Sequence, residues 1–202
     1  MMLHYKAIEP RCLELLKKLQ CIPKFSEFRL VGGTALALHL DHRLTNCIEI
    51  STSSSNDNFD LHSALSLLNY SIARRTNYLT EINIEGISVD ISFYPYPWIK
   101  EAIIDNEITL AHIEDIAAIK LHTISSETSK EDFFDIAVLL EQLSLKDMLG
   151  FYTKKFTAAT LDSVLKSLLS FENTEMELDP IMSVDLNWSQ VKEKITSAVK
   201  SL

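Results

Sequence analysis

The chain has 202 residues, of which 47% are hydrophobic and 23% are charged, and its formal net charge is -9 at pH 7. This size and composition predict a buried core in one domain, or in one domain and a small second lobe. The negative charge argues against tight non-specific binding of nucleic acid, because that affinity comes mainly from Lys and Arg. We find no apolar run of about 18 residues and no export pattern at the N-terminus, so we expect a cytoplasmic protein that does not enter a membrane.

The cysteines indicate a reducing compartment. Cys12, Cys21 and Cys47 are odd in number and lack the spacing of zinc ligands, so free thiols are expected. The six histidines also show no metal-ligand spacing.

The first half of the chain alternates between expected helices and strands. Leucines at helical spacing predict a helix over residues 8–20, and a short apolar strand then ends at Val31. Gly32 and Gly33 follow and lead into an expected helix over residues 34–40.

A second strand is expected over residues 47–51, and the Ser- and Asn-rich composition of residues 51–58 predicts a loop. A helical stretch is expected to begin at Asp60. Alternating apolar and polar residues over 79–84 and 87–93 then predict a hairpin that turns between them.

In the second strand of this hairpin the apolar residues share one face, and Asp90 is expected on the other. From residue 109 we expect helices to the end of the chain. The domain organisation predicted is an α/β domain over residues 1–108 and a helical lobe over residues 109–202.

Three charged residues lie on or near apolar helix faces in the second half. Lys120 falls in the middle of the apolar stripe of a helix over residues 113–124. The next helix begins at Ser129, with Asp132 near its apolar face and Asp135 at the margin. Two further amphipathic helices, over residues 161–171 and 188–199, are separated by an acidic loop.

A strand that ends in two glycines before a helix can bind a phosphate, because backbone N–H groups approach the anion and the helix dipole favours negative charge. Gly32, Gly33 and Thr34 therefore form a candidate anion cradle, although a tight strand-to-helix turn needs glycine for its conformation alone. Glu49 and Asp90 are candidate ligands for Mg²⁺.

The later charged residues have both a chemical and a structural explanation. Lys120 could supply a cation for phosphoryl or nucleotidyl transfer, or extend its amine to solvent. Asp132 and Asp135 could act in a site, or stabilise the first turn of their helix.

The order of these motifs resembles the AbiEii/AbiGii nucleotidyl transferase toxin family over about residues 10 to 145. The motifs are, in order, the run from Phe28 to Leu40, His42-Arg43-Leu44-Thr45, Val89-Asp90-Ile91, the run from Ile113 to Lys120, and the run from Lys130 to Ile136. The resemblance implies a nucleotidyltransferase-type α/β domain with a mixed sheet, followed by a helical C-terminal lobe. It also implies a nucleoside triphosphate substrate, Mg²⁺ or Mn²⁺, an acceptor that is RNA or protein, and a partner antitoxin.

The resemblance assigns a role to each matching position. Gly32, Gly33 and Thr34 match the phosphate-binding turn, Arg43 matches a basic residue ahead of the metal motif, Asp90 matches the third carboxylate, and Lys120, Asp132 and Asp135 match the later Lys and Asp-x-x-Asp positions.

The metal motif departs from the family pattern. Where the family has Asp-x-Asp, this chain has Cys47-Ile48-Glu49. A thiol is a soft ligand that suits Mg²⁺ poorly, and Cys47 could equally be a small core residue. Glu49 keeps the charge on a longer side chain, and a displacement of about 1 Å at a reacting centre can cost on the order of a hundredfold in rate.

Three interpretations follow. The chain is a family member that keeps the fold and nucleotide binding but transfers poorly, with catalytic positions at Glu49, Asp90, Lys120, Asp132 and Asp135 and metal positions at Glu49, Asp90 and the altered Cys47. Alternatively, it is an active transferase that uses Glu49 and Asp90, with or without Asp132, together with one metal ion or with Mn²⁺. The third interpretation is a non-catalytic protein that binds a protein partner.

Overall fold

The computed structural model describes residues 3–55, 59–126, 128–157 and 160–202. The chain forms two units. The first contains residues 1–41 and 45–112, and the second contains residues 42–44 and 113–202. The sequence predicts the division between residues 108 and 109, whereas here it falls after residue 112. A short piece of the N-terminal half also belongs to the second unit.

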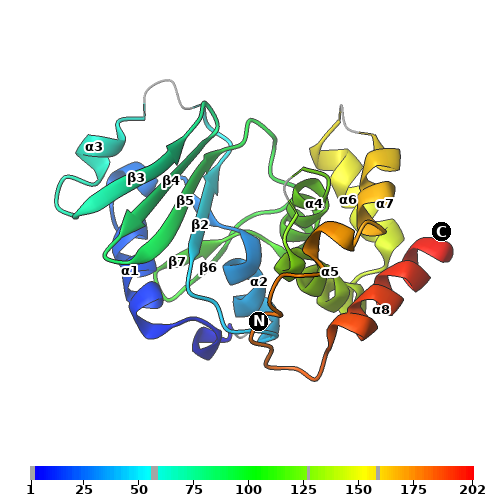
Figure 1. Ribbon diagram of the computed structural model, residues 1–202. Coiled ribbons are helices and arrows are strands. Elements are labelled where there is room, and N and C mark those ends of the chain that lie inside the picture. The colour runs from blue at the N-terminus through cyan, green and yellow to red at the C-terminus, as the bar shows by residue number, and fades with distance from the viewer. Residues whose placement is uncertain (1–2, 56–58, 127, 158–159) are drawn as a thin grey trace. The chain divides into compact units, whose positions relative to one another are not determined.

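The first unit is built around a mixed sheet (Figure 1). Its elements are η1 (Tyr5–Ala7), α1 (Pro10–Gln20), η2 (Pro23–Phe25), β1 (Arg29–Leu30), α2 (Gly32–Leu40), β2 (Ile48–Thr52), α3 (Leu61–Ala64), β3 (Tyr70–Arg75), β4 (Leu79–Ile84), β5 (Ile87–Phe93), β6 (Ile103–Asp105) and β7 (Ile108–Leu110). The strand order is β3-β4-β5-β2-β1-β7-β6. The pairs β2–β5 and β1–β7 are parallel, and the other neighbours are antiparallel.

The predicted hairpin is confirmed at both strands, because β4 and β5 have the expected bounds. Its turn residues Glu85 and Gly86 both have positive φ, at 52° and 90°, as a tight hairpin turn requires. Val89 and Ile91 are fully buried, while Asp90 lies on the opposite face of the strand.

Some elements of the first unit differ from the prediction. β3 was not predicted, because five of its six residues are exposed and it therefore lacks the alternation that marks a half-buried strand. The prediction of helix from residue 109 is wrong at its start, because β7 includes residues 109 and 110. β6 and β7 are three-residue strands, which are too short to show a period. α3 is also shorter than expected. Of the predicted 51–58 loop, residues 56–58 lie outside the described part.

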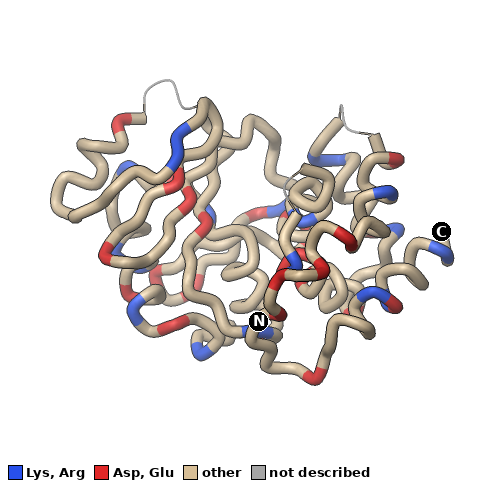
Figure 2. The backbone as a smooth tube through the Cα atoms, viewed as in Figure 1, with Lys and Arg blue, Asp and Glu red and all other residues tan. Residues whose placement is uncertain are grey.

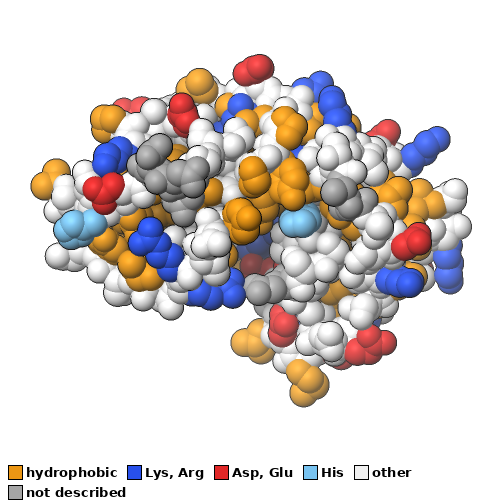
Figure 3. Space-filling model, turned by 90° about the horizontal axis from the view of Figure 1, so that it is seen from above, with side chains coloured by type: hydrophobic (Ala, Val, Ile, Leu, Met, Phe, Trp, Pro, Cys, Tyr) orange, Lys and Arg blue, Asp and Glu red, His pale blue; other side chains and the backbone are white. Residues whose placement is uncertain are grey.

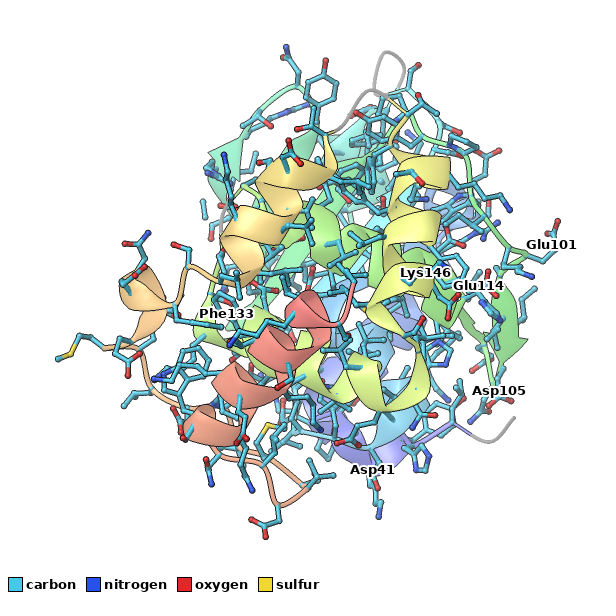
Figure 4. The ribbon with its side chains drawn as sticks, turned by 90° about the vertical axis from the view of Figure 1, so that its right-hand side faces the viewer. Asp41, Glu101, Asp105, Glu114, Phe133 and Lys146 are labelled. Carbon is cyan, nitrogen blue, oxygen red and sulfur yellow. The ribbon has the colours of Figure 1, made fainter. Side chains whose placement is uncertain are left out.

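The second unit is helical. Its elements are α4 (Ile113–Ile124), α5 (Lys130–Gln142), α6 (Leu145–Lys155), α7 (Leu161–Leu168), η3 (Glu172–Thr174) and α8 (Trp188–Lys200). Phe133 of α5, labelled in Figure 4, lies 5.7 Å from the Trp188 ring of α8 and 5.0 Å from the Phe171 ring, measured between centroids. These aromatic contacts join α5 to the C-terminal helix. Across the described ranges, no helix has both the length and the apolar character needed to cross a membrane.

A buried ion pair joins α4 to α6. Lys155 Nζ lies 2.9 Å from Asp115 Oδ1, and the two side chains are 1% and 0% exposed. We expect Lys155→Met to lower the free energy of unfolding by about 3–5 kcal/mol, because it takes the ammonium away from a buried carboxylate. Adding Asp115→Leu should recover most of the loss. Urea unfolding of both variants measures this, and a Lys155→Met variant as stable as the wild type would contradict it.

Candidate functional sites

Four charged residues lie opposite one another across four adjacent strands of the first unit. The strand register pairs Arg74 with Glu81, Glu81 with Asp90, and Asp90 with Glu49. Figure 2 shows this row as a basic position on β3 followed by acidic positions on β4, β5 and β2. Since neighbouring strands are about 4.8 Å apart, three carboxylates share one face of the sheet at close range.

Asp90 occupies an environment that disfavours its negative charge. Burial raises the pKa of Asp90 to about 6, the nearby Glu81 carboxylate adds to that rise, and Arg74 opposes it. Arg74 is itself paired with Glu81, with 3.0 Å between Arg74 Nε and Glu81 Oε1. Asp90 Oδ1 is buried and has no hydrogen-bond partner among the described residues. A positive charge placed beside Asp90 would therefore stabilise its ionised form.

The Glu49 side chain lies on the glycine turn at the start of α2. The backbone N–H of Gly33 donates to Glu49 Oε1 at 3.2 Å. A Cβ atom added to Gly32, whose φ is +67°, would lie 2.1 Å from Glu49 Cδ and from both carboxylate oxygens. The positive end of the helix attracts an anion, and in this structure the anion is the protein's own carboxylate.

Thr34 and Cys47 meet behind this turn. Thr34 is fully buried, and its hydroxyl donates to the carbonyl of Cys47 at 2.8 Å and lies 3.8 Å from the Cys47 thiol. The Cys12 thiol contacts the same carbonyl at 3.4 Å. The Thr34 hydroxyl thus ties α2 to the segment that leads into β2, and its proton is already donated within the protein.

The candidate ligands for a divalent metal ion in the first unit are the carboxylates of Glu49 and Asp90. In the described part of the chain, no group of three or more His, Cys, Asp or Glu side chains is arranged to hold a metal ion. Mg²⁺ is often bound by one or two carboxylates together with substrate phosphates, and Glu49 and Asp90 meet that smaller requirement. The Cys47 thiol supplies no hard oxygen ligand.

In the second unit, Asp135 is the centre of a buried charge cluster. Its carboxylate lies 2.6 Å from Lys120 Nζ, 2.8 Å from Arg43 Nε and 2.7 Å from His42 Nε2. Burial alone would raise the pKa of Asp135, but the charge of Lys120, the hydrogen bond from His42 and the Arg43 guanidinium hold it well below its usual range.

Asp132 extends this cluster from the first turn of α5. One of its oxygens accepts from Lys120 Nζ at 2.8 Å, and the other accepts from the backbone N–H and the hydroxyl of Ser129 in a capping box. Arg43 also contacts Glu131 at 3.0 Å. The cap therefore fixes Asp132 and its bond to Lys120 together.

The structure distributes the predicted site residues between the two units. Gly32, Gly33, Thr34, Cys47, Glu49 and Asp90 lie in the first unit, and Arg43, Lys120, Asp132 and Asp135 lie in the second. Glu81 is not among the predicted site residues, although the predicted hairpin register already places it opposite Asp90. His42 appears in a quoted motif without a predicted role, because nothing local indicates that its side chain reaches Asp135 of the helical unit.

The mixed α/β fold with its seven-strand sheet is of the nucleotidyltransferase type, as the sequence analysis predicted. Among solved structures, JHP933 from Helicobacter pylori is similar over 96% of this chain and 92% of its own, with a TM-score of 0.59 and 16% identity. MenT4, a nucleotidyltransferase toxin from Mycobacterium tuberculosis, is similar over 96% of this chain and 86% of its own, with a TM-score of 0.60 and 10% identity.

ANT(2")-Ia, solved with adenylyl-2"-tobramycin, is similar over 70% of this chain and 94% of its own, with a TM-score of 0.54 and 12% identity. In sequence, an uncharacterized protein of Aquifex aeolicus is 26% identical over 203 residues, which cover 93% of each chain. A comparison with protein-family models finds no match. These similarities establish the fold.

The contact between Glu49 and the glycine turn can be tested by Gly32→Ala. We expect this substitution to lower the free energy of unfolding by about 1–2 kcal/mol. The new Cβ would be strained at positive φ and would displace the Glu49 side chain. Gly86→Ala is the matched control, since Gly86 also has positive φ but has no atom near its Cβ. In a Glu49→Ala background, Gly32→Ala should cost only as much as Gly86→Ala. If Gly32→Ala lowers the free energy of unfolding equally in the wild-type and Glu49→Ala backgrounds, the contact between Glu49 and the turn is contradicted.

The Asp135 cluster predicts a loss of stability and a change in its pH dependence. Asp135→Asn should lower the free energy of unfolding at pH 7 by about 3–5 kcal/mol, because Lys120 and Arg43 stay buried without the charge that they surround. Glu141→Gln on the same helix removes an exposed pair with Lys194 and should cost under about 1 kcal/mol.

The pKa of Asp135 is lowered on folding, so its stabilisation is present above the unfolded value of about 3.9 and is lost as the pH falls through the folded-state value. The stability difference between wild type and Asp135→Asn should therefore shrink below about pH 4. Urea unfolding from pH 7 downward measures it, and a difference that does not change with pH would rule out a charge-based role for Asp135.

Proposed function

We propose that the chain is a nucleotidyltransferase-like protein of the AbiEii toxin type, which binds a nucleoside triphosphate with Mg²⁺ or Mn²⁺ but transfers the nucleotide poorly. The observation that carries this proposal is the pairing of Glu49 with Asp90 on adjacent parallel strands, beside a thiol at the position of the missing carboxylate. Two carboxylates can hold one metal–nucleotide complex, whereas efficient transfer needs close control of the metal and of both reacting oxygens.

In this proposal each residue of the first unit has a defined task. Glu49 and Asp90 would hold the metal ion, which neutralises charge on the phosphates of the bound nucleotide. Asp90 suits this task because its buried, unpaired Oδ1 gains most from a nearby positive charge. The N–H groups of the glycine turn would donate to a phosphate oxygen.

Glu49 limits its own site. Its carboxylate already receives the Gly33 N–H, so a phosphate that uses this turn must displace it. A shorter carboxylate at this position would withdraw from the turn while keeping its charge on the sheet. The altered motif thus weakens both metal binding and phosphate binding, which favours low transfer activity.

A second candidate is a non-catalytic member of a toxin–antitoxin pair that binds a partner protein. The engagement of Lys120 favours it, because this lysine is 6% exposed and is bonded to both Asp132 and Asp135. A lysine held by two carboxylates compensates their buried charge and is a poor free cation for a transition state.

Restoring the family motif tests the proposal. We expect Cys47→Asp with Glu49→Asp to bind Mg²⁺–ATP, or whichever of Mg²⁺–CTP, –GTP and –UTP binds the wild type best, about tenfold more tightly, as measured by calorimetry. The restored variant gains one hard ligand and frees the Gly33 N–H. Cys21→Asp, at an exposed thiol, is the charge-matched control and should leave the affinity unchanged.

The outcomes separate the candidates. An affinity that does not respond to the restored motif would show that this strand is not the metal site. A wild-type protein that transfers labelled nucleotide efficiently to RNA or protein, with Asp90→Ala abolishing the transfer, would support an active enzyme. Absence of any thermal shift with all four nucleotides would favour the protein-binding role.

A further inference from the structure

Exposed apolar side chains concentrate on one segment of the second unit. Residues 175–186, which we call the strap, connect η3 to α8. Of eleven large apolar side chains exposed in the described part, four lie on the strap, and Leu44, paired with the strap through its backbone, is a fifth. The strap residues are Met176, Leu178, Ile181 and Val184, at 95%, 91%, 73% and 42% exposure.

The strap is held in place by a buried lysine. The side chain of Lys130 is 5% exposed, and its Nζ donates to the carbonyls of Glu175 and Glu177 and to Asp179 Oδ1, at 3.2, 2.6 and 3.0 Å. The backbone N–H of Lys130 donates to Glu177 Oε2 at 2.7 Å. These bonds fix the strap backbone while its apolar side chains remain in solvent.

A second set of bonds joins the strap to residues 42–44. The Leu44 N–H donates to the Ile181 carbonyl at 3.0 Å, and the Ser183 N–H donates to the His42 carbonyl at 2.8 Å. Leu44, itself 44% exposed, therefore lies beside the exposed Ile181. The exposed apolar side chains of this region therefore come from two segments that are far apart in sequence.

The same surface is acidic. Residues 172–187 contain five carboxylates and no Lys, Arg or His. The Lys192 side chain pairs with Glu175 and the Lys130 side chain with Asp179, but no Lys or Arg side chain of the described ranges forms an ion pair with Glu172, Glu177 or Asp185. The projection at the lower edge of Figure 3 shows apolar and acidic side chains together.

We propose that the strap is a docking surface for a segment of another protein in which apolar side chains alternate with lysine or arginine. A fixed apolar patch with an acidic rim is typical of a protein interaction site, and complementary charge selects the partner. Nucleic acid and anionic membranes carry the same sign of charge as the strap and are disfavoured. The proposal does not depend on nucleotide binding.

Selection from a library of displayed random 16-residue peptides on the wild-type protein tests this proposal. We expect the enriched peptides to combine a net positive charge with apolar residues. Their affinity should fall at least about tenfold for Met176→Ser/Leu178→Ser/Ile181→Ser and also fall for Glu172→Gln/Asp185→Asn. Leu67→Ser/Ile104→Ser, which removes two apolar side chains exposed elsewhere at 96% and 76%, is the matched control and should bind as the wild type does.

All the substituted side chains are exposed, so circular dichroism should show that each variant folds. Peptides that bind the strap variant and the control variant equally would overturn the proposal. Enrichment of neutral or acidic peptides would overturn the charge argument. If sedimentation shows a wild-type dimer that is lost in the strap variant, the surface binds a second copy of the chain instead. If the protein binds anionic lipid vesicles and the strap variant does not, the surface binds a membrane instead.

Discussion

The parallel pairing of β2 with β5 determines where the candidate carboxylates of the first unit can lie. Five consecutive residue pairs set this register, and it places Glu49 beside Asp90. Because side chains alternate between the faces of a strand, a slip of β2 by one residue against β5 would turn Glu49 toward the core, where Ile50 now lies. Burial of the apolar face thus determines which side chains lie on the polar face. The register of the antiparallel β4 against β5 places Glu81 in the same row.

The three carboxylates of that row repel one another, and two of them are compensated within the protein. Arg74 neutralises Glu81 at one end, and the N-terminus of α2 receives Glu49 at the other. Asp90 Oδ1, between them, has no hydrogen-bond partner among the described residues, and burial together with the nearby Glu81 carboxylate raises the pKa of Asp90. The two neighbours of Asp90 are thus satisfied within the protein, which makes Asp90 the carboxylate where an added cation would have the largest effect.

Much of the fold could be predicted from local pattern. The β4–β5 hairpin, α4 and α5 have strong periodicity and clear end signals, and the mixed α/β class followed from them. β3 could not be predicted because its side chains are exposed, and residues 42–44 could not be assigned because their partners, Asp135 and Ile181, are far along the chain. The position of Glu49 on the glycine turn was equally hidden, since a strand pattern gives the face of a side chain and not the direction of its end group.

The two groups of acidic residues that the sequence singled out have different physical surroundings. Asp135 is surrounded by Lys120, Arg43 and His42, and its negative charge is stabilised by the folded unit itself. Asp90 is half-buried, its Oδ1 lies out of solvent beside another carboxylate, and its negative charge is destabilised. A group whose charge is already compensated gains little from a ligand, whereas a group under electrostatic strain gains a great deal. On this reasoning Asp135 stabilises the helical unit, and ligand chemistry is to be sought around Asp90.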